Sequence, residues 1–462
     1  MNFWGFEVWG GLNLIAALLL SLLIANALKK TIPVLHDSLI PTSVLAGALL
    51  LIVATIYKAA ANAVMFDDAF FGGEGMKNFE IVTYHTLALG FIASTFKNAK
   101  KRFERNRKIE IFNTGVTTVA TYLIQGVVGL GITLMAAYVL EGLFPAAGVL
   151  LPFGYGQGTG QALNYGSIYE TEYAFADGKN FGLTVAALGF LSASIGGVIC
   201  LNILKRRNKI ASAKKEAQKM FSEQIQSEDE IAVNGSLDKL TVQIAIVVVT
   251  YFFTYVLMKL LGTLVPGMRS VIFGFNFLIG VLAASLVRII LNALQKVGWV
   301  KKKYTNDFLM TRISNVCFDV MVVSGIAAIQ LDLLKAYWGV LLLLGVAGAF
   351  VTYLYVALVS KTLFPAYCDE QFLVMYGMLT GTASTGVILL REIDENFESP
   401  ALDNLIYQNF PAIIFGFPMM LLATLAPRKP LLTWGILIVF FAVMNVILFR
   451  SFIFRKKRKR ER

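Results

Sequence analysis

Long apolar stretches, separated by short polar segments, run along most of the 462-residue chain. A helix needs about 20 mostly apolar residues to cross the hydrocarbon core of a membrane. The chain holds about eleven stretches of roughly that length, and each predicts one transmembrane helix. They cover residues 8–28, 40–58, 80–96, 113–140, 180–204, 241–262, 270–293, 308–331, 336–359, 402–426 and 431–454. We therefore expect an all-α integral membrane protein.

Composition points the same way. Hydrophobic residues make up 57% of the chain and charged residues only 15%, with a mean hydropathy of +0.67. Soluble domains are about 25% charged, so lipid is the solvent that this composition requires. Three scattered cysteines and two histidines give no disulfide or metal-ligand pattern, and we expect no cofactor and no resident metal. A net charge of +12 could indicate a nucleic-acid partner, but the basic residues lie in short runs between apolar stretches, so we expect none.

These basic runs predict the orientation of the chain in the inner or plasma membrane. Lys29 and Lys30 follow the first apolar stretch and no basic residue precedes it, so this stretch is expected to be a spanning helix with an external N-terminus. Threading the chain from that start places four further basic runs on the cytoplasmic side, at 97–108, 205–215, 301–303 and 455–460. The C-terminus is then cytoplasmic.

Two segments break the pattern of simple spans. The sequence Leu-Phe-Pro-Ala occurs at 143–146 and again at 363–366. Each copy leads to a segment rich in glycine, hydroxyl and amide groups, at 153–162 and 376–386. An odd number of crossings separates the two copies, so equivalent parts of the two halves must face opposite sides of the membrane. This is the inverted-repeat pattern of many secondary transporters.

The predicted organisation follows from this repeat. The first repeat covers residues 1–204, with a re-entrant hairpin at about 145–177, and a cytoplasmic linker covers 205–239. The second repeat covers 240–426, with a re-entrant hairpin at about 363–400, and 427–462 forms an extra helix and a basic cytoplasmic tail.

The glycine-rich segments are the candidate binding site. Glycine allows a positive φ, which we expect at Gly158 and Gly381, and irregular backbone inside a membrane survives only where protein buries it or it lines a wet cavity. The alternative is that small residues only let helices pack closely. The candidate substrate-binding residues are Tyr155, Gly156, Gln157, Gly158, Thr159, Gly160 and Gln161 in the first segment, and Gly381, Thr382, Ala383, Ser384 and Thr385 in the second.

Neutral oxygens near the second segment are candidate ligands of a coupling cation. These are the hydroxyls of Thr380, Thr382 and Ser384, with the carboxylate of Asp319 as a fourth candidate. An ionised carboxylate inside a span costs about 2.5–3.5 kcal/mol on insertion scales, so Asp319 is expected to face the protein interior. It could equally be a structural partner of a neighbouring polar residue, Arg312 or Asn315.

The run from Gly154 to Ala162, together with the second segment beginning at Tyr376, resembles the bacterial glutamate:sodium symporter family. The resemblance implies two inverted halves with re-entrant glycine-rich loops, homodimers and an elevator movement. It also implies import of glutamate, or of a related anionic amino acid or dicarboxylate, with sodium as the coupling ion. The chain departs from the family pattern at Tyr155 and Gln157, where glycine and histidine are common, in its second loop and in its extra helix.

Other functions compete with this one. A carrier of a different organic anion, coupled to protons or sodium, would have the same architecture. A channel would show flux that substrate does not saturate. A membrane-embedded enzyme would need a nucleophile with its base, or metal ligands, within the spans, and the sequence offers neither, so we do not expect an enzyme.

Overall fold

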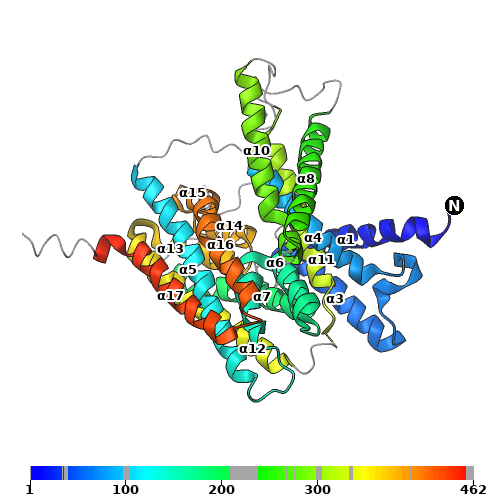
Figure 1. Ribbon diagram of the computed structural model, residues 1–462, viewed down its shortest axis with the longest axis horizontal. Helices are drawn as coiled ribbons and strands as arrows, with labels where there is room; N and C mark the ends of the chain where they lie inside the picture. Colours follow the sequence, from blue (N-terminus) through cyan, green and yellow to red (C-terminus); the bar gives the residue numbers. More distant parts are fainter. Residues whose placement is uncertain are drawn as a thin grey trace, which may run out of the picture.

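The computed structural model describes residues 2–33, 35, 40–96, 105–208, 238–266, 269–274, 276–297, 304–331, 337–394 and 398–453. Its regular elements are helices, and no β-strand occurs among the described residues (Figure 1). The basic runs that predict the orientation lie largely outside these residues, as does most of the linker at 205–239. The orientation therefore stays a prediction.

Among the residues that the structure describes, the first half of the chain forms six α-helices and three short 3-10 turns. They are α1 (Phe6–Thr31), α3 (Thr42–Ala61), η1 (Met65–Asp67), η2 (Ala69–Phe71), α4 (Gly75–Thr95), α5 (Arg105–Ala136), η3 (Pro145–Val149), α6 (Leu150–Tyr173) and α7 (Gly178–Asn208).

The second half contains more and shorter helices. They are α8 (Lys239–Leu264), α9 (Arg269–Gly274), α10 (Asn276–Lys296), α11 (Asp307–Ala327), α12 (Trp338–Leu363), η7 (Pro365–Tyr367), α13 (Cys368–Thr380), α14 (Ala383–Arg391), α15 (Ala401–Tyr407), α16 (Asn409–Leu425) and α17 (Pro430–Leu448).

The predicted membrane class is confirmed. In the described part of the chain, nine helices are long and apolar enough to span a membrane, and a bent pair formed by α15 and α16 makes up to ten. The remaining predicted span, 80–96, corresponds to α4, a 21-residue helix that carries Lys77 and Glu80 and is not in this set. The count of eleven therefore stays a prediction. The stretch at 270–293 contains the spanning helix α10, with α9 before it.

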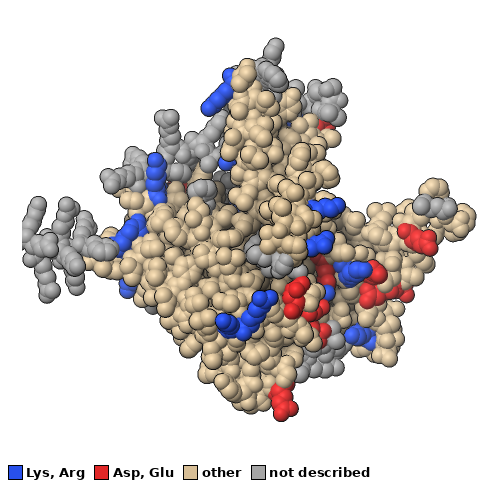
Figure 2. All heavy atoms as spheres, in the orientation of Figure 1, with Lys and Arg blue, Asp and Glu red and all other residues tan. Residues whose placement is uncertain are grey.

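The surface of the molecule suits lipid. Helix α8 exposes about half of the surface of Val248, Val249, Phe252 and Phe253. Most of the face seen in Figure 2 carries no charged side chain. Because large apolar patches are rare on soluble monomers, acyl chains are the natural partners of these side chains.

The helices form two groups that differ in their packing partners (Figure 1). The first helix group contains α1, α3, α4, α8, α9, α10 and α11. The second helix group contains α5, α6, α7 and α12 to α17, with α5 packed centrally against α12, α16 and α17. Each half of the chain first supplies helices to the first group and then supplies a helix, a broken helix and a further helix to the second. The main contacts between the groups come from α6 and α7.

Candidate functional site at two broken helices

Helix α6 reverses direction at Gly158, which we call the first break. Gly158 has φ 79° and ψ −171°, so the predicted positive φ is observed. The rings of Phe153 and Tyr165 stack across the break with their centroids 4.0 Å apart. In a continuous helix these two residues would be separated by about 18 Å along the axis. The two arms of α6 are therefore antiparallel.

The other glycines of α6 allow close packing. A Cβ atom on Gly154 would lie 2.8 Å from the backbone nitrogen of Ala186, and one on Gly160 would lie 2.7 Å from Leu87. At Gly156 the added carbon would overlap the ring of Tyr122. Backbone and an aromatic ring can yield little space at Gly154 and Gly156, and the Leu87 side chain can yield some at Gly160. The packing explanation therefore applies to these three positions, and among the glycines of this run Gly158 alone has a positive φ.

The second break comprises Gly381 and Thr382, between α13 and α14. A Cβ atom on Gly377 would lie 2.8 Å from the Cα atom of Gly386, so the two arms pack closely side by side. Gly381 has φ −135°, and the expected positive φ is wrong at this position. Its lack of a side chain is required for space instead, because a Cβ atom there would lie 2.9 Å from that of Ala193.

The two Leu-Phe-Pro-Ala copies adopt the same local structure. In each, proline opens a 3-10 turn directly before the broken helix, at Pro145 in η3 and at Pro365 in η7. Proline suits the first position of a helical turn because its φ is fixed and it has no N–H to satisfy there. The sequence repeat is thus also a repeat of backbone conformation.

One turn of α7 lies against both breaks. A Cβ atom on Gly189 would lie 2.6 Å from the carbonyl oxygen of Thr380 and 3.1 Å from the ring of Tyr155. Phe190 is the neighbour of Gly158, and Ala193 is the neighbour of Gly381. The candidate residues that are 220 or more positions apart in the sequence therefore meet around residues 189–193.

Helix α5 holds the first arms of both broken helices from another side. The Tyr122 hydroxyl donates to the carbonyl oxygen of Gly156 at 3.0 Å. The Gln125 amide donates to the carbonyl oxygen of Leu379 at 2.9 Å and to the Thr352 hydroxyl at 2.8 Å. Gln125 is a candidate on sequence grounds because it is an amide within a span, but the sequence does not predict these contacts. A phenol and an amide three residues apart on one helix are the signal that could have indicated them.

Gln161 is a candidate residue whose side-chain amide is buried without a hydrogen-bond partner. Its side chain is 1% exposed, and neither its amide nitrogen nor its amide oxygen has a hydrogen-bond partner in the structure. Buried polar groups are nearly always paired, so a donor and an acceptor are available here to a polar ligand. Gln161 lies in the first turn after the break, where the backbone N–H groups of a helix are also unpaired.

The other candidates in the first segment are placed as follows. Thr159 is buried, and its hydroxyl donates to the carbonyl oxygen of Met321 at 3.3 Å. The Tyr155 hydroxyl donates to the carbonyl oxygen of Gly345 at 2.5 Å, which joins the first arm of α6 to α12 within the second helix group. Gln157 is half-buried.

The second segment places hydroxyls at the start of α14. The Thr382 hydroxyl accepts the N–H of Thr385 at 3.2 Å and lies 3.1 Å from the hydroxyl of Thr385. The Thr380 hydroxyl donates to the backbone carbonyl oxygen of Tyr376 within α13, so the lone pairs of the Thr380 oxygen stay available. Ala383 is exposed, and the side chain of Ser384 lies outside the described part of the structure.

Asp319 is placed differently from the other cation candidates. Its carboxylate lies beside the side chain of Ser43 in α3, within the first helix group. Arg312, one of its two expected structural partners, lies over the ring of Phe308. The contacts that join α11 to the first break come from Met321 and Gly325 instead.

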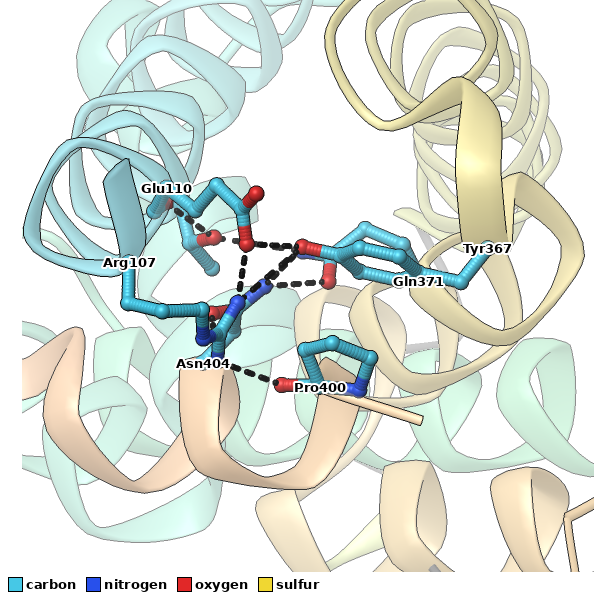
Figure 3. A network of polar contacts seen from close by, with 7 residues as sticks. Arg107, Glu110, Tyr367, Gln371, Pro400 and Asn404 are labelled. Carbon is cyan, nitrogen blue, oxygen red and sulfur yellow. Dashed lines mark hydrogen bonds and ion pairs between the residues drawn. The ribbon is translucent and has the colours of Figure 1, made fainter. Parts of the chain in front are cut away.

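A polar network anchors the base of the second broken helix (Figure 3). Tyr367 donates to the Glu110 carboxylate at 2.7 Å, and Glu110 forms an ion pair with Arg107. The Asn404 side-chain amide of α15 donates to the Tyr367 hydroxyl and to the side-chain amide oxygen of Gln371, each at 3.0 Å. Arg107 donates to Asn404 at 3.1 Å. The network joins α5, α13 and α15, and so fixes the base of a helix whose tip contacts α7.

An all-helical, multi-pass membrane protein in which two broken helices meet inside the fold has the architecture of a secondary transporter. The family model described as "Sodium/glutamate symporter" matches residues 10–397, and the chain belongs to this family. No curated protein matches the chain. The family consists of transporters rather than enzymes, and it implies sodium as the coupling ion.

Proposed function

We propose that this protein imports glutamate, or a closely related anionic amino acid, together with sodium by alternating access. One observation carries this proposal: single turns of α5 and α7 contact both breaks, so the two glycine-rich segments form one site. Such interrupted helices place backbone groups and helix ends where a transported ion and substrate can use them.

The chemistry of the site suits an anion and a cation. The second arm of α6 begins at Thr159 and helix α14 begins at Ala383, so both present unpaired N–H groups and a positive helix end to a carboxylate. The first arms end in carbonyl groups. With the hydroxyls of Thr380, Thr382 and Ser384, these carbonyls are hard oxygen ligands for sodium.

Asp319 has a separate role in this proposal. Asp319 is part of α11 in the first helix group, whereas Thr380 and Thr382 belong to the second break in the second helix group. We keep it as a candidate ligand of a further cation between α3 and α11, formed by the carboxylate and the Ser43 hydroxyl.

The two helix groups have different roles in the proposed movement. We propose that the first helix group is the scaffold, through which homodimers form, and that the second group carries the site across the membrane as an elevator. Two glycines at the boundary support this division, because Gly160 faces the Leu87 side chain and Gly325 faces the Thr159 side chain, so each contact has a side chain on one surface only. With an external N-terminus, the two broken helices enter from opposite faces as inverted repeats.

The energetics require the coupling ion. Glutamate carries one negative charge at neutral pH, and the negative cell interior opposes its entry. Each sodium ion contributes about 2.3 kcal/mol per 100 mV of membrane potential, so one ion cancels the electrical cost and two make uptake electrogenic.

Purified protein in liposomes provides the test. We expect uptake of labelled glutamate that saturates, requires an inward sodium gradient and shows counterflow. Uptake driven equally well by a pH gradient without sodium would contradict the proposal and favour a proton-coupled carrier. Flux that does not saturate would favour a channel.

A further inference from the structure

The boundary between the two helix groups is largely apolar or formed by backbone. A Cβ atom on Gly325 of α11 would lie 2.6 Å from the Thr159 side chain, and the Asn164 amide donates to the carbonyl oxygen of Gly274 at 3.0 Å. Contacts of this kind can be exchanged for similar ones when one group moves past the other.

One described ion pair at this boundary has a different character. The Lys179 ammonium, at the start of α7, lies 2.9 Å from the Glu80 carboxylate of α4. The same ammonium lies 3.4 Å from the carboxylate of Glu170 in α6, which also accepts the backbone N–H of Lys179 at 3.2 Å. The three side chains are only 26–31% exposed. Glu80 belongs to the first helix group, whereas Lys179 and Glu170 belong to the second.

We propose that Lys179 is an exchangeable latch between the two helix groups. It is bound to Glu80 in the conformation described here, and it is retained by Glu170 when the groups separate. This inference rests on the proposed movement of one group against the other, and it assigns a positioning role to residues outside the breaks.

The arrangement of charges supports an exchange rather than a static bridge. Removing one partner from a half-buried ion pair leaves an uncompensated charge, which slows separation of the two surfaces. Glu170 travels with Lys179, so the ammonium keeps a carboxylate partner after Glu80 is lost.

A neighbouring contact provides a direct readout of the latched state. Asn180, next to Lys179, accepts the backbone N–H of Gln330 in the first group at 3.0 Å. We would replace the native cysteines Cys200, Cys317 and Cys368, introduce cysteine at positions 180 and 330 of the full-length protein in lipid, and measure the yield of disulfide under mild oxidation.

The two carboxylates should respond differently. Glu80→Gln removes the latch and should lower the disulfide yield roughly two- to fivefold, the factor that corresponds to an ion pair of modest strength. Glu170→Gln leaves Lys179 bound to Glu80 alone, so the yield should stay the same or rise while glutamate uptake slows. Glu74→Gln is the matched control, because Glu74, just before α4, pairs with Lys77 in its first turn at 2.8 Å and both are largely exposed.

The outcomes separate this inference from the proposed function. An unchanged yield in Glu80→Gln, or equal losses in both variants, would overturn the latch even if uptake is driven by sodium. A selective loss in Glu80→Gln supports the latch even if the transported anion is not glutamate, because cross-linking does not depend on transport.

Discussion

The backbone of Gly158 offers the cleanest test of the first break. Its φ of 79° and ψ of −171° lie in a region that is populated almost only by glycine. A Cβ atom there would meet nothing closer than the ends of Met321 and Phe190, each 4.0 Å away. Gly158→Ala therefore adds no steric clash, and its whole effect comes from backbone conformation.

The size of the effect follows from that conformation. Holding a residue other than glycine in such a region costs about 1–3 kcal/mol. At about 1.4 kcal/mol per factor of ten, this shifts an equilibrium between intact and distorted breaks roughly 5- to 150-fold. We expect sodium-driven glutamate uptake to fall within that range, with a lower midpoint of thermal unfolding.

Two other glycines calibrate the measurement. Gly435→Ala in α17 meets no atom within 4 Å and should leave uptake unchanged. Gly160→Ala crowds only the flexible end of Leu87, at 2.7 Å, and should have an intermediate effect. If Gly158→Ala transported at the rate of the Gly435→Ala control with the same thermal stability, the break would have no role in transport.

Two further comparisons test the contacts around the second break. Gln125→Leu leaves the buried Leu379 carbonyl oxygen without its donor, which costs about 1–3 kcal/mol, and should reduce uptake. Gln243→Leu removes a similar bond to the Tyr304 carbonyl oxygen, next to the first helix group. It should lower stability while preserving the apparent affinity for sodium. Thr382→Val removes both a helix cap worth about 1 kcal/mol and a proposed sodium ligand, so the sodium concentration for half-maximal uptake should rise roughly tenfold. Asp319→Asn should change that concentration less, and a larger effect of Asp319→Asn would place the coupling cation at α3 and α11 instead.

The sequence allowed the location of both breaks to be predicted, because glycines and hydroxyls gather there against an apolar background. It could not indicate what lies against them. Gly189 occurs in an apolar span like any packing glycine, and its importance arises from the approach of Thr380 and Tyr155, which only tertiary structure determines. The same reason explains Gly381, where the need for glycine comes from the closeness of Ala193 and not from φ.

The division into two helix groups also could not be predicted from hydropathy. Spans of both groups are equally apolar, because hydropathy reports the lipid environment and not the neighbouring helix. The signal that does separate them is the repeated order of elements, in which the Leu-Phe-Pro-Ala copies mark equivalent points. Aligning the halves at these copies predicts that the helices before and after each broken helix belong to the same group as that broken helix. In the first half these are α5 and α7, and in the second half they are α12 and α15.

The two broken helices have different neighbours, and this difference characterises the conformation described here. The first break contacts the first helix group directly, through Thr159 with Met321 and Gly160 with Leu87. The main contacts of α13 and α14 are instead with α5, α6, α7, α12 and α15, inside the second helix group. In the predicted orientation the first broken helix enters from outside, and in the proposed elevator the first helix group, as the scaffold, would then cover the external approach to the site. A movement that exposes the site to the outside must then separate Thr159 and Gly160 from the scaffold while the polar network around Arg107 and Tyr367 travels unbroken with the second group.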